Sequence, residues 1–239
     1  MFCQDTIIIL HGWQSSRQQW SEVEQKLEKS NKNIIVIIPN LPGFKKKTEL
    51  SCVWDLDDYV DWFKEFSSNF NQPFFLLGHS FGGRIAIKFA ELYPERLKGL
   101  ILVSSAGIIP KRKFSRSIIS KIANLGKIFS CFPFYKLFRK GFYKYILQTS
   151  DYIQAEKLPF LKETFKNVIK EDLRKYFNKI KIPCLIIWGD KDKLTPLSDG
   201  YLMNKQIPNS KLEILKDIGH CPYKEIPEIL TQKILNFIN

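Results

Sequence analysis

The chain has 239 residues, of which 44% are hydrophobic and 26% charged, and its formal net charge is +13 at pH 7. This composition is typical of a folded globular domain and argues against a disordered protein. No apolar run approaches the roughly 20 residues that cross a bilayer, and the N-terminus has no basic leader, so we expect a cytoplasmic protein without a membrane span. The five cysteines are scattered and lack CxxC spacing, which argues against a disulfide framework or a zinc site.

Short apolar runs rich in Ile, Val and Leu predict buried strands along the whole chain. Most of these runs do not alternate in polarity, which is typical of strands covered on both faces of a parallel sheet. In chain order, strands are expected at 6–10, 34–38, 74–77, 100–103, 184–188 and 212–215, and helices around 20–27, 56–66, 85–92 and 226–237. The alternation predicts an α/β fold, a doubly wound and mainly parallel sheet whose ligand sites lie at the carboxyl ends of its strands.

The interval between the fourth and fifth predicted strands is far longer than a crossover connection needs. Apolar residues within it keep helical spacing at 118–129 and again at 161–169. We therefore expect a helical cap, or lid, at 108–172, inserted into a core that is formed by 1–107 and 173–239.

The stretch LLGHSFGG places glycines around one serine where the third predicted strand leads into a helix. A serine on so tight a turn takes a strained backbone conformation, and side chains two residues before and after it would collide with their surroundings. Gly78 and Gly82 remove those side chains, while His79 and Phe81 flank Ser80. The Ser80 hydroxyl is therefore expected at the end of the sheet, where the partial positive charge of a helix N-terminus favours an anion.

This Gly-x-Ser-x-Gly arrangement resembles the nucleophile elbow of the α/β hydrolase family. The resemblance implies that Ser80 is the nucleophile and that an acid and then a histidine follow it along the chain. After the fifth predicted strand, GDKDKLTP matches the family's Gly-x-x-Asp pattern, and IGHCPYKEIPE after the sixth matches its Gly-His pattern. The resemblance thus implies Asp192 as the acid and His220 as the base, with Asp190 and Asp217 as rival acids.

The motif LHGW after the first predicted strand resembles the His-Gly motif of the same family. It implies that the backbone N–H groups of Trp13 and Phe81 form the oxyanion hole. His11 and Gly12 are expected to support this loop, and His79 to fill a permissive position beside the nucleophile.

The positive charge is concentrated in residues 96–150, which contain twelve Lys or Arg residues and no acidic residue. Such a surface can attract anionic substrates or contact an anionic membrane face. We favour the interpretation that this basic surface is solvated and covers an apolar pocket. Peripheral membrane contact is the less favoured alternative. No nucleic-acid binding is expected, because no motif supports it.

Together these features predict a serine hydrolase that cleaves small to medium carboxylic esters through an acyl-enzyme intermediate. The expected partner is a small-molecule ester, with a weak preference for an anionic one, and neither a metal nor a cofactor is needed. The alternatives are lactone, thioester or carbon–carbon bond hydrolysis by the same triad, and a ligand-binding receptor with little turnover.

Little sequence precedes the LHGW motif. We therefore expect six parallel strands, without the two strands that usually come first in the family. An unprotected sheet edge invites pairing with another chain, so a monomer and a dimer both stay open.

Overall fold

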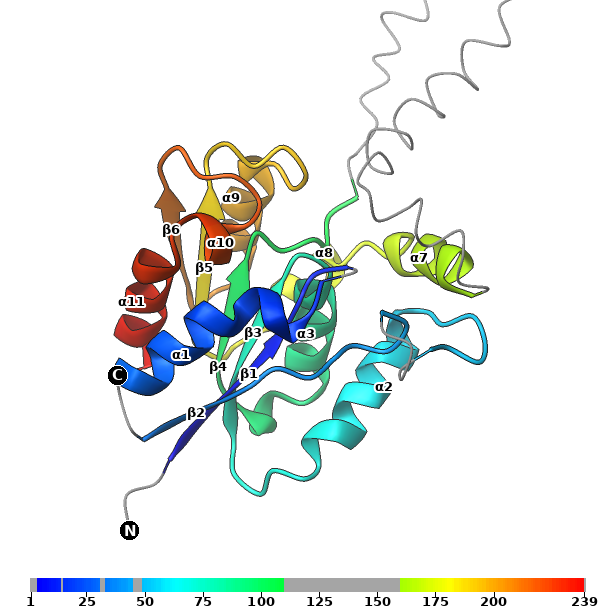
Figure 1. The fold of residues 1–239 in the computed structure, drawn as a ribbon. Helices are drawn as coiled ribbons and strands as arrows, with labels where there is room; N and C mark the ends of the chain where they lie inside the picture. The colour runs from blue at the N-terminus through cyan, green and yellow to red at the C-terminus, as the bar shows by residue number, and fades with distance from the viewer. Residues whose placement is uncertain (1–3, 14, 31–32, 45–48, 110–159, 239) are drawn as a thin grey trace, which may run out of the picture.

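The computed structural model describes residues 4–13, 15–30, 33–44, 49–109 and 160–238. Its centre is a six-stranded sheet in the order β2-β1-β3-β4-β5-β6, in which all the neighbouring strands are parallel (Figure 1). The strands are β1 (Asp5–Leu10), β2 (Ile34–Ile37), β3 (Phe74–His79), β4 (Leu97–Val103), β5 (Cys184–Gly189) and β6 (Ser210–Leu215). Every predicted strand is present, and the predicted six-stranded parallel sheet is confirmed.

The strand register brings the carboxyl ends of β3, β4 and β5 to the same edge of the sheet. His79, the last residue of β3, lies opposite Val103 at the end of β4, and Val103 lies opposite Ile187 near the end of β5. Loops that follow parallel strands therefore meet at one rim. The predicted site residues Ser80, Asp192 and His220 all lie in loops that follow a strand at this rim.

Two apolar clusters cover the two faces of the sheet, because successive side chains along a strand point to opposite faces. Ile8 and Leu10 of β1 pack into one cluster with helices α2 (Leu56–Ser67), α3 (Phe81–Leu92) and α9 (Leu197–Gln206). Ile7 and Ile9 pack into the other with α1 (Ser21–Ser30), α10 (Pro222–Glu225) and α11 (Pro227–Ile238). Each strand of the centre is thus buried on both sides, as its continuous apolar sequence predicts.

The four helices expected from apolar spacing correspond to α1, α2, α3 and α11. Figure 1 shows α1 and α11 side by side on one face of the sheet and α3 behind it. The structure also contains shorter elements that the apolar spacing did not predict. They are α8 (Arg174–Phe177), α9, α10 and the 3₁₀ turns η1 (Arg17–Trp20) and η3 (Pro94–Arg96). Within the described residues, no helix is long and apolar enough to cross a membrane.

Helix α7 (Leu161–Ile169) is the described part of the predicted cap. It contacts the loop that leads into α2, because the Trp54 backbone N–H donates to Thr164 Oγ1 at 2.9 Å. The apolar spacing predicted at 161–169 is therefore a helix. The predicted helix at 118–129 and most of the basic stretch lie outside the described residues, so the cap at 108–172 stays a prediction.

A group of charged side chains fastens the segment after α7 to helix α3. Lys88 of α3, whose side chain is 6% exposed, contacts Glu171 at 3.0 Å and Asp57 of α2 at 2.6 Å. Glu171 also accepts from Tyr176 at 2.7 Å and contacts Lys175 at 2.9 Å. Although burial opposes it, hydrogen bonding to Lys175, Tyr176 and Lys88 lowers the pKa of Glu171 to about 2. The Glu171 carboxylate is therefore ionised and links α3 to the segment that follows α7.

Replacing Glu171 with Gln is expected to lower the free energy of unfolding by about 1 kcal/mol at pH 6. A carboxyl with a lowered folded-state pKa stabilises fully above its unfolded pKa, and this contribution is lost as the pH falls toward the folded value, which is about 2 here. The difference between wild type and Glu171→Gln, measured by urea unfolding, should therefore shrink as the pH falls from about 5 to about 2. A matched control is Asp5→Asn, which removes the half-exposed pair with Lys98. A penalty for Glu171→Gln that stays constant with pH would contradict this account.

Candidate active site

Ser80 lies in the tight turn between β3 and α3 and has a strained backbone. Its φ is 51° and its ψ is −113°, a backbone conformation that residues other than glycine rarely adopt. A Cβ atom on Gly82 would lie 2.0 Å from the Leu10 carbonyl oxygen, and one on Gly78 would lie 2.6 Å from the carbonyl oxygen of Gly82. Both predicted glycine positions are thus required by close backbone packing. The turn is fixed further by the Ser80 N–H, which donates to the Val103 carbonyl at 3.2 Å.

His220 and Asp192 form the shortest polar contact at this rim. His220 Nδ1 lies 2.7 Å from Asp192 Oδ2, and the Asp192 side chain is fully buried. The other carboxylate oxygen, Oδ1, accepts from the backbone N–H groups of Leu194 at 2.8 Å and Thr195 at 3.0 Å. Burial raises the pKa of Asp192, but the hydrogen bonds from His220 and Thr195 outweigh it and hold the pKa below its ordinary value. The pair is therefore an ionised carboxylate against an imidazole.

The two rival acids are placed differently. Asp217 is 68% exposed at its side chain and lies 3.7 Å from Lys191. Asp190 has a buried Oδ1 that finds no hydrogen-bond partner among the described residues. Of the three aspartates considered from the sequence, Asp192 is the one that is hydrogen-bonded to His220.

Ser80 and His220 are brought to the same place by the packing of their neighbours. The ring of His79, which directly precedes Ser80, lies 5.0 Å from the ring of His220. Because Asp192 engages Nδ1 of His220, Nε2 is the nitrogen left for a proton transfer. Within the residues that the structure describes, no hydrogen bond joins Ser80 Oγ to His220. Such contacts are often long in unliganded enzymes and tighten with substrate.

The predicted oxyanion-hole residues are Trp13, in the loop after β1, and Phe81, which directly follows Ser80. The loop through Gly12 approaches closely, since a Cβ on Gly12 would lie 3.4 Å from Ser80 Cβ. In the described parts of the chain, the backbone N–H groups of Trp13 and Phe81 have no hydrogen-bond partner. Unpaired N–H donors of this kind are what stabilisation of a tetrahedral oxyanion requires.

His11 is a buried part of the Gly12 loop. Its Nε2 accepts from the Leu41 backbone N–H at 3.2 Å, so its Nδ1 carries the proton and donates to the Gly12 carbonyl at 2.9 Å. The ring is 0% exposed. His11 therefore holds the loop through Gly12 against the segment that contains Leu41.

Aromatic side chains gather next to the two proposed oxyanion donors. The Trp13 ring lies 4.8 Å from Phe44, 5.0 Å from Phe81 and 4.9 Å from Phe165. Phe165 belongs to α7, so the described part of the predicted cap reaches the site. We call Trp13, Phe44, Phe81 and Phe165 the aromatic wall, an apolar cluster of the kind that lines ligand sites.

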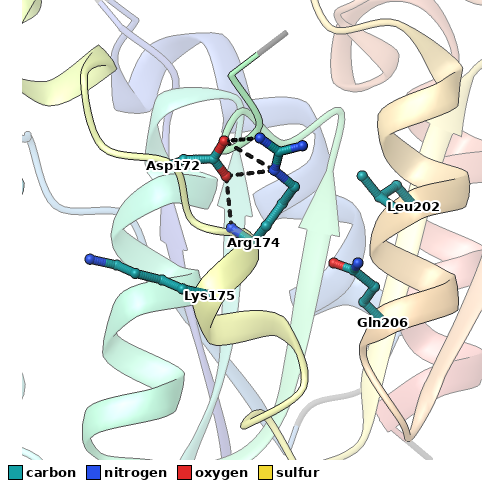
Figure 2. Close-up of a pocket in the computed structure, with 5 residues that line it drawn as sticks. All are labelled: Asp172, Arg174, Lys175, Leu202 and Gln206. Carbon is teal, nitrogen blue, oxygen red and sulfur yellow. Dashed lines mark hydrogen bonds and ion pairs between the residues drawn. The ribbon is translucent and has the colours of Figure 1, made fainter. Parts of the chain in front are cut away.

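A separate hollow of about 760 Å³ lies between α8 and α9 and is shown in Figure 2. The residues that line it are Asp172, Arg174, Lys175, Leu202 and Gln206. Arg174 Nε donates to Asp172 Oδ1 at 2.8 Å and to Asp172 Oδ2 at 3.0 Å. The Asp172 carboxylate therefore neutralises the charge of the Arg174 guanidinium. None of these lining residues belongs to the motifs predicted from the sequence, and we assign the active site to the rim instead.

Comparison with known proteins identifies the family of this fold. The family described as having the α/β hydrolase fold matches residues 5–227. The chain belongs to this α/β hydrolase family. Monoacylglycerol lipase ABHD6 of Mus musculus is 26% identical, over 98% of this chain and 75% of the relative. Lipase 1 of Psychrobacter immobilis is also 26% identical, over 92% of this chain and 73% of the relative.

A solved structure, a thermophilic esterase from Thermogutta terrifontis, has a TM-score of 0.70 with this α/β hydrolase. The likeness covers 98% of this chain and 89% of that one, at 22% sequence identity. At this identity the likeness shows the shared fold alone.

Sequence reasoning missed Thr195 as a partner of the acid. Thr195 Oγ1 lies 2.8 Å from Asp192 Oδ2 and 3.3 Å from His220 Nδ1, and 3.1 Å from the Ser104 carbonyl oxygen. A threonine three residues after the acid, directly before Pro196, is the only signal that the sequence carries for this contact.

Replacing Gly82 with Ala is expected to destabilise this α/β hydrolase by about 3 kcal/mol or more, because the added Cβ would overlap the β1 carbonyl groups. Its position would be 2.0 Å from Leu10 O and 2.7 Å from His11 O. The matched control is Gly219→Ala, where the added Cβ meets only the flexible end of Glu225, at 3.2 Å. Thermal unfolding of both variants measures the difference. Equal melting temperatures for the two variants would contradict the close packing of the turn.

Proposed function

We propose that this α/β hydrolase cleaves carboxylic esters, with Ser80 as nucleophile, His220 as general base and acid, and Asp192 as the residue that orients His220. The observation that carries the proposal is the 2.7 Å contact between His220 Nδ1 and the buried Asp192 carboxylate. It lies at the rim that holds the strained Ser80. The relatives named as lipases support ester hydrolysis as the class of reaction.

The proposed reaction uses each of these groups in turn. His220 Nε2 takes the proton of Ser80 Oγ, and the oxygen attacks the ester carbonyl carbon. Asp192 keeps the proton of His220 on Nδ1 and stabilises the imidazolium that forms. The N–H groups of Trp13 and Phe81 bind the oxyanion, and His220 then donates its proton to the leaving alcohol. Water attacks the acyl-enzyme with His220 as base, which releases the acid and restores Ser80.

The aromatic wall supports a substrate with an apolar acyl part. Four rings next to the oxyanion donors can cover an alkyl chain, and polar side chains are not needed to bind it. One of the relatives is named for monoacylglycerols. We therefore propose monoacyl esters of small alcohols as the first substrates to test, with residues 108–172 as a cap over them and a cytoplasmic location.

Replacing Ser80 with Ala is expected to abolish labelling by a fluorophosphonate probe, because the probe reacts with an activated serine oxygen. Hydrolysis of p-nitrophenyl esters should fall on the order of 10⁶-fold if the triad acts as a unit. The same assay over esters, lactones and thioesters of graded acyl length distinguishes the possible bonds. Labelling of wild type without turnover on any member of the panel would favour the receptor alternative. Equal turnover by wild type and Ser80→Ala would overturn the proposal.

Replacing Asp192 with Asn is expected to lower kcat on the order of 10⁴-fold, because an amide favours the wrong tautomer of the adjacent imidazole. The matched control is Asp217→Asn at the exposed rival position, which should keep kcat within about twofold, since exposed charges contribute little. Steady-state kinetics of both variants on one ester decides between the two acids. Loss of kcat in Asp217→Asn with full activity in Asp192→Asn would reverse the assignment.

A further inference from the structure

His79, the residue before the nucleophile, is buried between the segments that build the active site. His79 is only 3% exposed to solvent. Nε2 of His79 lies 2.9 Å from the backbone carbonyl oxygen of His220, a residue 141 positions away along the chain. A carbonyl oxygen can only accept, so Nε2 of His79 carries the proton and donates it. The side chain next to Ser80 therefore holds the main chain of the proposed base.

The ring of His79 is fixed by aromatic neighbours from two other segments. It lies 5.8 Å from Trp20 at the end of η1 and 5.0 Å from Tyr223 in α10. Trp20 and Tyr223 themselves stack at 4.3 Å. With His220 at 5.0 Å, these contacts leave the imidazole little freedom to turn its Nε2–H away from the His220 carbonyl.

The second nitrogen of His79 faces the oxyanion loop. Nδ1 is buried and has no hydrogen-bond partner in the described part of the chain. A Cβ on Gly12 would lie 2.9 Å from this nitrogen, so a residue with a side chain cannot take that place without displacing the ring. A buried acceptor without a partner costs stability, so this nitrogen calls for an explanation. Here the imidazole of the residue next to Ser80 faces the Gly12 loop through Nδ1 and holds the His220 loop through Nε2.

The protonation state of His79 affects His220, because the two rings lie close together. Burial and, to a smaller extent, the nearby His220 lower the pKa of His79, while the hydrogen bond to the His220 carbonyl and the Asp192 charge oppose them, and the resulting pKa is about 3. The titratable and charged groups that face it are thus His220, Asp192, His11 and, by ring contact, Tyr223. His79 is therefore neutral near pH 7. A neutral ring leaves His220 free to become an imidazolium, whereas a second positive charge would oppose it.

We propose that His79 is a positioning residue, which holds the His220 backbone carbonyl so that one imidazole can serve Asp192 through Nδ1 and Ser80 through Nε2. This inference rests on the proposed function. Its chemistry is specific, because an N–H donor is needed at the place of Nε2 and a ring of similar shape without that donor does not replace it. Misplacing a catalytic group by about 1 Å can cost on the order of 10²-fold in rate.

The test compares three variants of the full chain. His79→Phe keeps a ring but removes the donor, and His79→Gln places an amide N–H near the position of Nε2. Trp20→Phe is the matched packing control, since it changes the same aromatic stack without touching the hydrogen bond to His220. For each variant we would measure the melting temperature, kcat and KM on a p-nitrophenyl ester, and the pH dependence of kcat/KM.

We expect kcat of His79→Phe to fall roughly 10- to 100-fold with little change in KM, and the acid limb of its pH profile to move. His79→Gln should recover most of the loss. Trp20→Phe should lower the melting temperature but keep kcat within about threefold and the acid limb in place, because it leaves the positioning hydrogen bond intact. A His79→Phe variant with wild-type kcat and acid limb would overturn the inference. So would losses of kcat that follow melting temperature alike in His79→Phe and Trp20→Phe.

A separate readout distinguishes failure of this inference from failure of the proposed function. The chain has three histidines, so their ring signals can be followed individually by NMR. In wild type the His79 signal should not titrate above about pH 4, in line with the pKa of about 3. The backbone carbonyl signal of His220 should shift in His79→Phe and return in His79→Gln. If wild type hydrolyses no ester, the ester proposal fails, while an unchanged His220 carbonyl signal would reject the positioning contact by itself.

Discussion

The hydrogen bond between Asp192 and His220 is the interaction on which the rest of the site depends. A carboxylate that is fully buried survives in its ionised form only because His220, Thr195 and backbone N–H groups surround it. That arrangement fixes Nδ1 of His220 toward Asp192 and leaves Nε2 for the proposed nucleophile. In the proposed reaction, the direction of proton transfer therefore follows from one buried contact, 2.7 Å long.

The parallel sheet makes this contact achievable from distant parts of the chain. β3, β5 and β6 end at one rim, and the loops that follow them carry Ser80, Asp192 and His220. Close packing of the glycines keeps the turn at Ser80 in its strained form, and stability from the two apolar clusters offsets that strain. His79 then connects the turn to the loop of the base. Fold and site are thus held by the same few segments.

Most of the fold and the tight turn at Ser80 could be predicted from the sequence, because each depends on a local pattern. Continuous apolar runs predicted the buried strands, and the spacing of Gly78, Ser80 and Gly82 predicted the elbow. The contacts of Thr195 and the His79 hydrogen bond to His220 could not be predicted, since they depend on how two loops pack after the sheet has formed. Short helices such as α8 and α10 were also missed, because four residues are too few to show a period.

The central claim is that Ser80 carries the acyl group during turnover. The most direct measurement is to quench the protein with acid during hydrolysis of a p-nitrophenyl ester and to map the acylated peptide by mass spectrometry. The account predicts the added acyl mass on the peptide that contains Ser80, in an amount that reaches its plateau before the steady state of product release. Acyl mass on another residue, or ester consumption with no acylated peptide at any time, would contradict it.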